Sequence, residues 1–170
     1  LLQRYEQVVV TVANEQKQVA TGFLLEVSGR CRIVTTAEIA KGDLAILMRH
    51  HPPAGGESRV VVLAGKVRAR DAETGLALVE PLLVQEQDRD VPLFRIRASA
   101  LADPVPGLAV YAIAALQIGP ALLDHSVFQG EITATDRPGA PRRRCQASLP
   151  CNPGSSGAPV MDREGRLVGM

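Results

Sequence analysis

Near the end of the chain, the stretch CNPGSSGAPV (residues 151–160) forms a glycine- and serine-rich loop that could present a nucleophile. A serine that attacks an acyl group needs an exposed hydroxyl on a tight turn, with backbone N–H groups directed at the oxygen that becomes negative. Gly154 allows a backbone conformation that a side chain would block, and Ser156 offers a hydroxyl and an N–H group. We therefore expect the nucleophile at Ser156 and an oxyanion-binding loop at Gly154, Ser155 and Ser156, although surface loops of all-β proteins often share this composition.

The rest of the chain consists of short apolar and β-branched runs separated by Gly, Pro and polar residues, which is typical of strands. Six runs lie at residues 7–13, 19–27, 31–37, 44–49, 58–70 and 76–80, and six more at 92–97, 108–114, 126–136, 144–148, 158–161 and 166–170. Helix signals are weak, with one turn expected in TAEIAKGD (36–43). This pattern favours an all-β sandwich or barrel over βαβ units. We predict two lobes, 1–82 and 91–170, joined by a polar linker at 83–90.

The composition excludes several function classes. A net charge of +1 over 170 residues gives no overall field toward nucleic acid, and 3% aromatic residues provide no stacking platform for bases. No apolar run approaches the roughly 20 residues of a membrane-spanning helix. No phosphate-binding or dinucleotide-binding motif appears, so no cofactor is predicted. The run Arg142–Arg144 is either a contact for an acidic partner or, more simply, a solvated hairpin loop.

The cysteines and histidines do not form a metal site in the sequence. No C-x-x-C pattern is present, and no histidine clusters with a cysteine, so we predict no metal. The three cysteines, Cys31, Cys145 and Cys151, leave at least one thiol unpaired within the chain. We expect buried or free thiols, with a short-loop disulfide between Cys145 and Cys151 as the alternative.

The segment QASLPCNPGSSGAPVMDREGRLVGM (146–170) resembles the active-serine region of trypsin-like serine proteases, especially the HtrA-type branch. That branch reads N-P-G-N-S-G-G-P-[LV], then a turn and G-x-[VL]-[VI]-G. The residues that match in register are Asn152, Pro153, Gly154, Ser156, Gly157, Pro159, Gly165 and Gly169, while Ala158 replaces the second glycine. The segments ATGFLLEVSGRCRIVTTAEIAKGD, RDAETGLALVE, PVPGLAVYAIA and SVFQGEITATDRP resemble other family stretches in the same order. The resemblance covers roughly residues 5–170 and implies a trypsin-like double six-stranded β-barrel.

The same resemblance places Glu38 at the position of the general-base histidine and Gly75 at the position of the aspartate that orients it. Only Ser156 keeps the family residue. A glutamate carboxylate, with an ordinary pKa of about 4.3, is a weaker base than imidazole by about two pH units. Losing triad members lowers the rate by about 10⁴-fold or more. The leading interpretation is therefore a catalytically inactive homologue, a pseudoprotease that binds a protein or peptide.

Two other interpretations stay open. An active serine endopeptidase would use Ser156 with Glu38 or a histidine as base, with Asp71 or Glu73 supplying a second carboxylate. The three histidines, however, lie outside the family's base position: His50 and His51 precede a hairpin in the first lobe, and His125 begins a strand in the second. The third interpretation is a structural or regulatory domain within a longer polypeptide.

The expected specificity pocket carries no acid. In the family, the residue six positions before the serine sets the preference for basic side chains, and here it is Pro150, flanked by Leu149 and Cys151. The resemblance thus implies a preference for an apolar side chain. The chain begins without methionine, and we expect it to be part of a longer polypeptide or assembly; the sequence does not indicate a compartment.

Overall fold

The computed structural model describes residues 5, 7–50, 56–82, 95–97, 100–118, 122–135 and 144–170, and the chain forms strands β1 to β12 within them. The strands are β1 (Val9–Asn14), β2 (Val19–Val27), β3 (Arg30–Thr36), β4 (Leu44–His50), β5 (Arg59–Asp71), β6 (Leu76–Leu82), β7 (Ile96–Arg97), β8 (Ala109–Ile118), β9 (Leu122–Ala134), β10 (Gln146–Ala147), β11 (Val160–Met161) and β12 (Leu167–Gly169). Each predicted run overlaps one of these strands, in the predicted order. The predicted linker at 83–90 lies outside the described residues.

The first lobe is a closed barrel. Its strands follow the order β1-β4-β5-β6-β3-β2, and a further pairing between β1 and β2 closes the ring. β7 adds to β2 in parallel, with Leu25 opposite Ile96, so it belongs by hydrogen bonding to the first sheet although its sequence run falls in the second set. Inside the barrel, side chains such as Val10, Leu24 and Ile33 have no exposed area. Burial of this apolar face is the main force that closes the ring.

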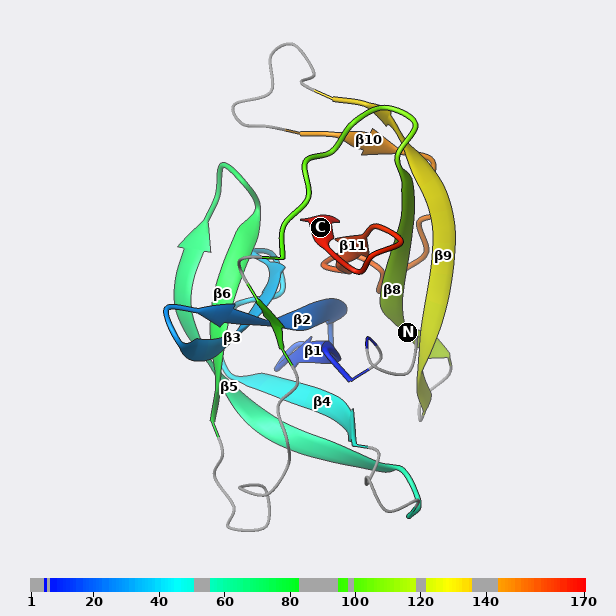
Figure 1. Ribbon diagram of the computed structural model, residues 1–170. Coiled ribbons are helices and arrows are strands. Elements are labelled where there is room, and N and C mark those ends of the chain that lie inside the picture. The colour runs from blue at the N-terminus through cyan, green and yellow to red at the C-terminus, as the bar shows by residue number, and fades with distance from the viewer. Residues whose placement is uncertain are drawn as a thin grey trace.

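The second lobe is a curled half-barrel of five strands in the described part of the chain, in the order β10-β9-β8-β11-β12. Its main feature is the long antiparallel pair of strands β8 and β9 (Figure 1). The all-β, two-lobed prediction is confirmed, while the sixth strand predicted for this lobe is β7, which pairs with β2. Among the described residues, no helix has the length and hydrophobicity needed to span a bilayer.

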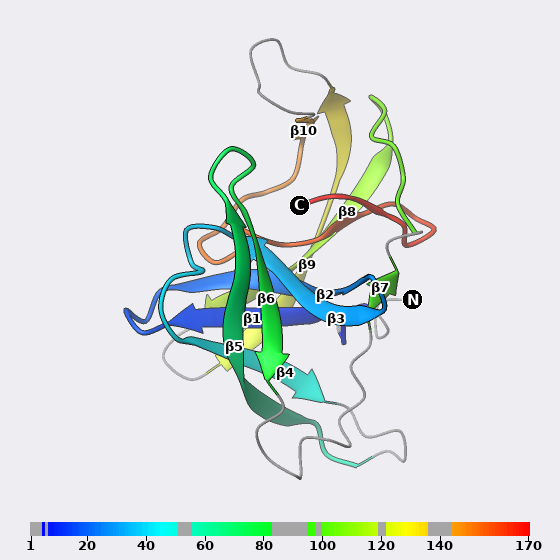
Figure 2. The same cartoon turned by 90° about the vertical axis from the view of Figure 1, so that its left-hand side faces the viewer.

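An apolar layer joins the two lobes. Val9 and Phe23 lie on the outer face of the first barrel, and they pack with Ile113, Met161 and Leu167 of the second lobe. All five are at most 8% exposed. β1 and β2 are therefore buried on both faces, which explains why their sequences read as nearly continuous apolar runs. In Figures 1 and 2 the β5–β6 hairpin extends along this junction toward the C-terminal end.

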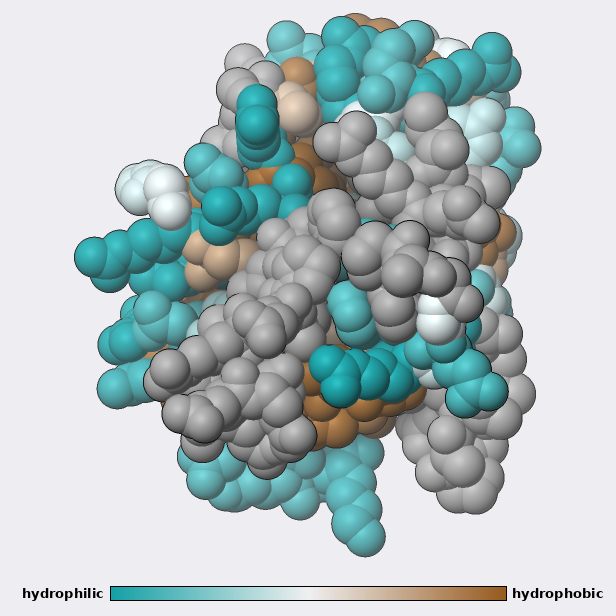
Figure 3. Space-filling model, turned by 60° about the horizontal axis from the view of Figure 1, so that its bottom comes forward, coloured by the Kyte–Doolittle hydropathy of each residue, from teal (hydrophilic) through white to brown (hydrophobic). Residues whose placement is uncertain are grey.

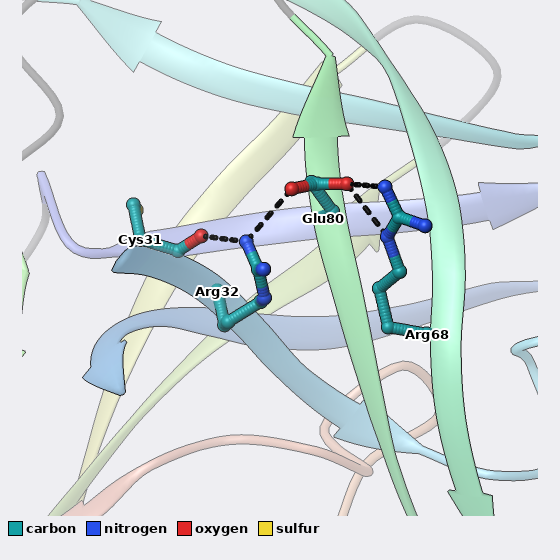
Figure 4. Close-up of polar contacts among 4 residues, drawn as sticks. All are labelled: Cys31, Arg32, Arg68 and Glu80. Atoms are coloured by element: carbon teal, nitrogen blue, oxygen red, sulfur yellow. Dashed lines mark hydrogen bonds and ion pairs between the residues drawn. The ribbon is translucent and has the colours of Figure 1, made fainter. Parts of the chain in front are cut away.

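A polar network on the outside of the first barrel links three strands (Figure 4). Glu80 of β6 accepts hydrogen bonds from Arg32 of β3 at 3.0 Å and from Arg68 of β5, whose Nε lies 2.6 Å away. Arg68 is the extra residue of a β-bulge between Val67 and Ala69, and the bulge redirects its side chain toward Glu80. The hydrogen bond from Arg68, helped by the charge of Arg32, lowers the pKa of Glu80 below its ordinary value. The network joins the neighbouring strands β3, β6 and β5 through their side chains.

Elsewhere, the outer surface of the barrel carries both polar and apolar side chains. Val60 and Val62 of β5 are 56% and 58% exposed, and they are the most exposed large apolar side chains described on this barrel. Figure 3 shows apolar patches on the face that includes the bottom of the molecule, bordered by hydrophilic residues. Exposed apolar side chains are normal on a folded domain and by themselves indicate no particular site.

Candidate functional site

The serine loop lies between β10 and β11 and begins with a tight turn. The N–H of Ser155 donates to the carbonyl oxygen of Asn152 at 3.0 Å, and the Ser155 hydroxyl donates to the same oxygen at 2.7 Å. Gly154 and Gly157 have φ angles of +89° and +91°, which side chains disfavour. The turn leaves Ser156 exposed at its tip.

The loop is fastened to the first lobe through Thr21 of β2. The Thr21 N–H donates to the Ser156 carbonyl at 2.9 Å, and the Thr21 hydroxyl donates to the Gly154 carbonyl at 2.7 Å. A Cβ atom at Gly157 would lie 2.0 Å from the Thr21 carbonyl oxygen, so only glycine fits there. Both lobes are therefore needed to shape the loop.

The two N–H groups expected to face an oxyanion are not used within the described chain. Neither the Gly154 N–H nor the Ser156 N–H donates to a described residue, whereas the Ser155 N–H is engaged with Asn152. The donors that remain for a bound oxygen are therefore those of Gly154 and Ser156. An arrangement of this kind suits a carbonyl or carboxylate oxygen of a ligand.

Glu38 and Gly75 lie next to each other at the end of the first barrel. Glu38 is exposed in a turn directly after β3, and Gly75 ends the turn between β5 and β6 with φ at +72°. The Ala37 N–H donates to the Gly75 carbonyl at 2.7 Å, which joins the two turns. A Cβ atom built at Gly75 would meet no atom within 4 Å. Glu38 makes no hydrogen bond or ion pair with any residue that the structure describes.

Thr35 connects this pair of turns to the serine loop. Its hydroxyl donates to the Thr21 carbonyl at 2.8 Å, and Thr21 in turn holds Ser156 and Gly154. Thr35 lies three residues before Glu38 in the chain. It is opposite Ala77 of β6, which lies two residues after Gly75. A chain of hydrogen bonds thus connects strand β3, which leads to the Glu38 turn, with the loop that carries Ser156.

The Asp71 carboxylate and the Glu73 backbone take part in the hydrogen bonds of the β5–β6 turn. The Asp71 side chain accepts from the Glu73 N–H at 2.9 Å, and the Asp71 carbonyl accepts from the Gly75 N–H at 2.9 Å. Arg144 of the second lobe reaches across and donates to the Glu73 carbonyl at 3.2 Å. No hydrogen bond joins Asp71 or Glu73 to Glu38. Arg142 and Arg143 lie outside the described residues.

The histidines lie on other parts of the two sheets. His50 ends β4 opposite Arg59, and His125 lies in β9 opposite Ala115. Neither forms a hydrogen bond with Ser156, and His51 lies outside the described residues. Within the described ranges, no group of three or more His, Cys, Asp and Glu side chains could hold a metal ion.

The segment expected to line the specificity pocket is apolar on one side. Leu149 is partly buried against the cluster of Ala112, Ala114 and Ala158, while Pro150 and Cys151 are exposed. All three cysteines are free thiols. The roles of Leu149, Pro150 and Cys151 in binding a ligand stay predictions.

A groove that the sequence did not indicate opens beside Gly75. It has a volume of about 540 Å³ and runs between the first barrel and β12. Leu76, Leu78, Leu167 and Met170 give it an apolar lining, and Arg70 is among its polar lining residues. The groove joins residues about 90 positions apart in the chain, so no local pattern could have revealed it.

Comparisons with known proteins agree with this geometry. The model of a family described as "Trypsin-like peptidase domain" matches residues 20–170. No curated protein matches the chain. The solved MamO protease domain from Magnetospirillum magneticum, in its apo form, superposes with a TM-score of 0.73 at 19% identity, covering 100% of this chain and 86% of that one.

Two further solved structures show the same fold. Deg5 superposes with a TM-score of 0.75 at 18% identity, covering 99% of this chain and 80% of that one. The serine endoprotease from Yersinia pestis gives 0.73 at 22% identity, covering 99% of this chain and 54% of that one. At these identities the likeness concerns the fold alone, and it confirms the double-barrel architecture predicted from the sequence.

Proposed function

Because the chain belongs to the trypsin-like peptidase domain family, we propose that it is a catalytically inactive member that binds a protein or peptide. One observation carries the proposal. The turn that follows β3 presents Glu38 where the resemblance expects an imidazole, and the adjoining turn presents Gly75, which has no side chain to orient a base.

The chemistry explains why these two positions decide the activity. A serine hydroxyl attacks an acyl group only when a base removes its proton and later donates that proton to the leaving group. In the family an acid beside the base holds it in the correct orientation. At Gly75 the corresponding space is open, so nothing there orients or stabilises a protonated base.

The retained features suit binding. The Gly154 and Ser156 N–H groups can donate to a ligand oxygen, and the partly buried Leu149 offers an apolar contact in the segment before the loop. The apolar groove beside Gly75 extends the surface across the lobe junction. We therefore propose a peptide ligand with an apolar side chain near the serine loop.

Labelling of Ser156 with a fluorophosphonate tests the loss of catalysis. The protein and its Ser156→Ala variant are compared from about pH 4 to 9, the range over which carboxylate and imidazole bases titrate. We expect equal, background labelling of both proteins. Labelling that requires Ser156 would contradict the proposal, and its pH profile would identify the base.

Peptide display followed by titration calorimetry tests the binding. We expect selected peptides to carry an apolar residue and to bind the Ser156→Ala variant as tightly as the unmodified protein. Leu149→Asp is expected to weaken this binding, because it places a charge against an apolar cluster. Peptides that bind without an apolar preference, or independently of Leu149, would contradict the proposed site.

An active enzyme with Glu38 as base is the second candidate. It is favoured by the exposure of the Glu38 carboxylate, which forms no hydrogen bond within the described chain. Such an enzyme would label best at about pH 4–5, where a carboxylate base and its conjugate acid are both present. Loss of that labelling in Glu38→Gln would support this candidate.

A further inference from the structure

We propose that Thr21 is a positioning residue: its buried hydroxyl holds the loop 152–157 in the form that leaves the Gly154 and Ser156 N–H groups open. This inference rests on the proposed function in treating the loop as the ligand-binding surface. Thr21 belongs to β2 of the first lobe, whereas the loop belongs to the second. The contact therefore couples the shape of the site to the way the lobes are packed.

Two peptide groups of the loop are anchored by this one residue. The peptide between Gly154 and Ser155 directs its carbonyl to the Thr21 hydroxyl at 2.7 Å and its N–H to the Asn152 carbonyl at 3.0 Å. The peptide between Ser156 and Gly157 directs its carbonyl to the Thr21 N–H at 2.9 Å. Only the peptide between Ser155 and Ser156 lies between these two, and its N–H is the Ser156 donor.

The anchoring fixes the direction of that donor. The carbonyl of this peptide, that of Ser155, accepts from the Ala158 N–H at 3.0 Å, and the peptide groups on either side are held by Thr21 and Asn152. Rotation of the Ser156 N–H would therefore break the bond to Ala158 and disturb the bonds to Thr21 and Asn152. A rotated Gly154–Ser155 peptide would bring its carbonyl toward the ligand side, where it would repel an incoming oxygen. A preformed donor binds such an oxygen better than one that must be ordered on binding.

Thr21 is itself held rigidly. Its carbonyl accepts from the Thr35 hydroxyl at 2.8 Å, and both threonines have no exposed area. Among the described residues, the Thr21 hydroxyl is the donor to the carbonyl of the half-buried Gly154, so replacing this hydroxyl removes the bond that holds that carbonyl. The side-chain hydroxyl of Thr21, rather than its volume, is therefore the feature that acts on the loop.

Thr35 provides a matched control. Thr21→Val and Thr35→Val each replace an equally buried hydroxyl by a methyl group of similar size, but only the first removes a bond to the loop. A purely structural role of Thr21 would make the two variants alike. A positioning role would perturb the loop in Thr21→Val alone, and Thr21→Ser would restore it.

The test uses ¹H–¹⁵N spectra and hydrogen exchange of assigned loop amides, which require neither a ligand nor a reactive serine. We expect Thr21→Val to shift or broaden the Ser155 and Ser156 signals and to speed Ser155 exchange by about fivefold, the effect of one lost net hydrogen bond. Thr35→Val and Thr21→Ser are expected to leave these signals near their positions in the unmodified protein. Unchanged loop signals in Thr21→Val, or equal changes in Thr35→Val, would overturn the proposal.

A measurement on the unmodified protein covers the case in which Thr21→Val does not fold. We expect the Thr21 hydroxyl proton to exchange slowly and to show a nuclear Overhauser contact to the Gly154 α-protons. Rapid exchange of that proton without this contact would also overturn the proposal. Either result is independent of fluorophosphonate labelling and peptide binding, so a failure here is distinct from a failure of the proposed function.

Discussion

The backbone N–H of Ala37 donates to the carbonyl oxygen of Gly75 at 2.7 Å, and this bond places the Glu38 turn against the β5–β6 turn. The two turns that carry Glu38 and Gly75 are thus joined directly by their backbones. Arg70 strengthens this connection by donating to the Ala37 carbonyl at 3.1 Å. Under the proposed function, side chains able to act as a base and an orienting acid can be placed at these two positions as a test.

The double variant Glu38→His with Gly75→Asp is expected to gain Ser156 labelling by a fluorophosphonate. A general base contributes about 10²- to 10⁴-fold, and a base without its orienting acid contributes much less. We therefore expect about 10²-fold faster labelling at pH 7 in the double variant and little gain in either single variant. An added side chain at Gly75 meets open space, and its φ of +72° is one that aspartate tolerates better than most residues.

Ser156→Ala in the same double variant is the control, because it must abolish any gained labelling. If the double variant folds with normal cooperativity and still labels at the background rate, the two positions are not arranged as a base and its orienting acid. The assignment of Glu38 and Gly75 to those positions would then be wrong.

Gly157→Ala is expected to destabilise the protein strongly. Its Cβ would lie 2.0 Å from the Thr21 carbonyl oxygen, so the loop would have to move off β2. We expect a loss of about 3 kcal/mol or more in the free energy of unfolding, measured with urea. Gly29→Ala is the matched control, since Gly29 also has a positive φ, of +72°, but has no atom within 4 Å of an added Cβ. It should lose only about 1 kcal/mol from backbone strain, and equal losses in both variants would contradict the close contact.

The positions of the strands along the chain and the two-lobed architecture could be predicted from the sequence, because β-branched runs and turn residues are local signals. The partner of each strand was less accessible. β7 has only two residues and pairs with β2 about 70 positions earlier, so its run gave no indication of which sheet it joins. Strand pairing depends on contacts across the whole fold, which periodicity does not encode.

The site residues also divide into those with local sequence signals and those positioned by long-range contacts. The loop around Ser156 was accessible because its glycines and prolines are adjacent in the chain. Thr21 was not, since it reaches Gly154 across 133 positions and sits in a run that reads as an ordinary strand. Arg144 was expected on a solvated loop, yet it contacts the Glu73 carbonyl of the other lobe. Contacts between lobes need the tertiary structure.

Asp162 is expected to make stability depend on pH. It is 2% exposed and accepts from the Arg166 N–H at 2.8 Å and from the Arg166 guanidinium at 2.7 Å. Burial alone would raise the pKa of Asp162, but these hydrogen bonds outweigh it and lower the pKa below its ordinary value. A lowered pKa gives stability that is present above the ordinary value of about 3.9 and is lost as the pH falls through the lowered value.

Urea unfolding of Asp162→Asn from about pH 3 to 7 measures this contribution. The gap in unfolding free energy from the unmodified protein should be largest above about pH 5, at about 1–3 kcal/mol, and should narrow toward pH 3. Glu164→Gln is the control, because Glu164 is 67% exposed and its pair with Arg166 spans 3.4 Å. A gap for Asp162→Asn that stays constant with pH would contradict the ionised, hydrogen-bonded state of Asp162.

The three thiols are expected to react at two different rates. Cys145 and Cys151 are exposed, whereas Cys31 packs against the core of the first barrel. Burial raises the pKa of the Cys31 thiol, although the charges of Arg95 and Arg32 act in the opposite direction. Because only the thiolate reacts, an aromatic disulfide reagent at about pH 8 should modify two thiols quickly and the third at least about tenfold more slowly.

Cys31→Ala is the control for this assignment, and it should remove the slow phase alone. A single slow thiol that is joined by two fast thiols after reduction would instead reveal a disulfide between Cys145 and Cys151 and would contradict their description as free thiols.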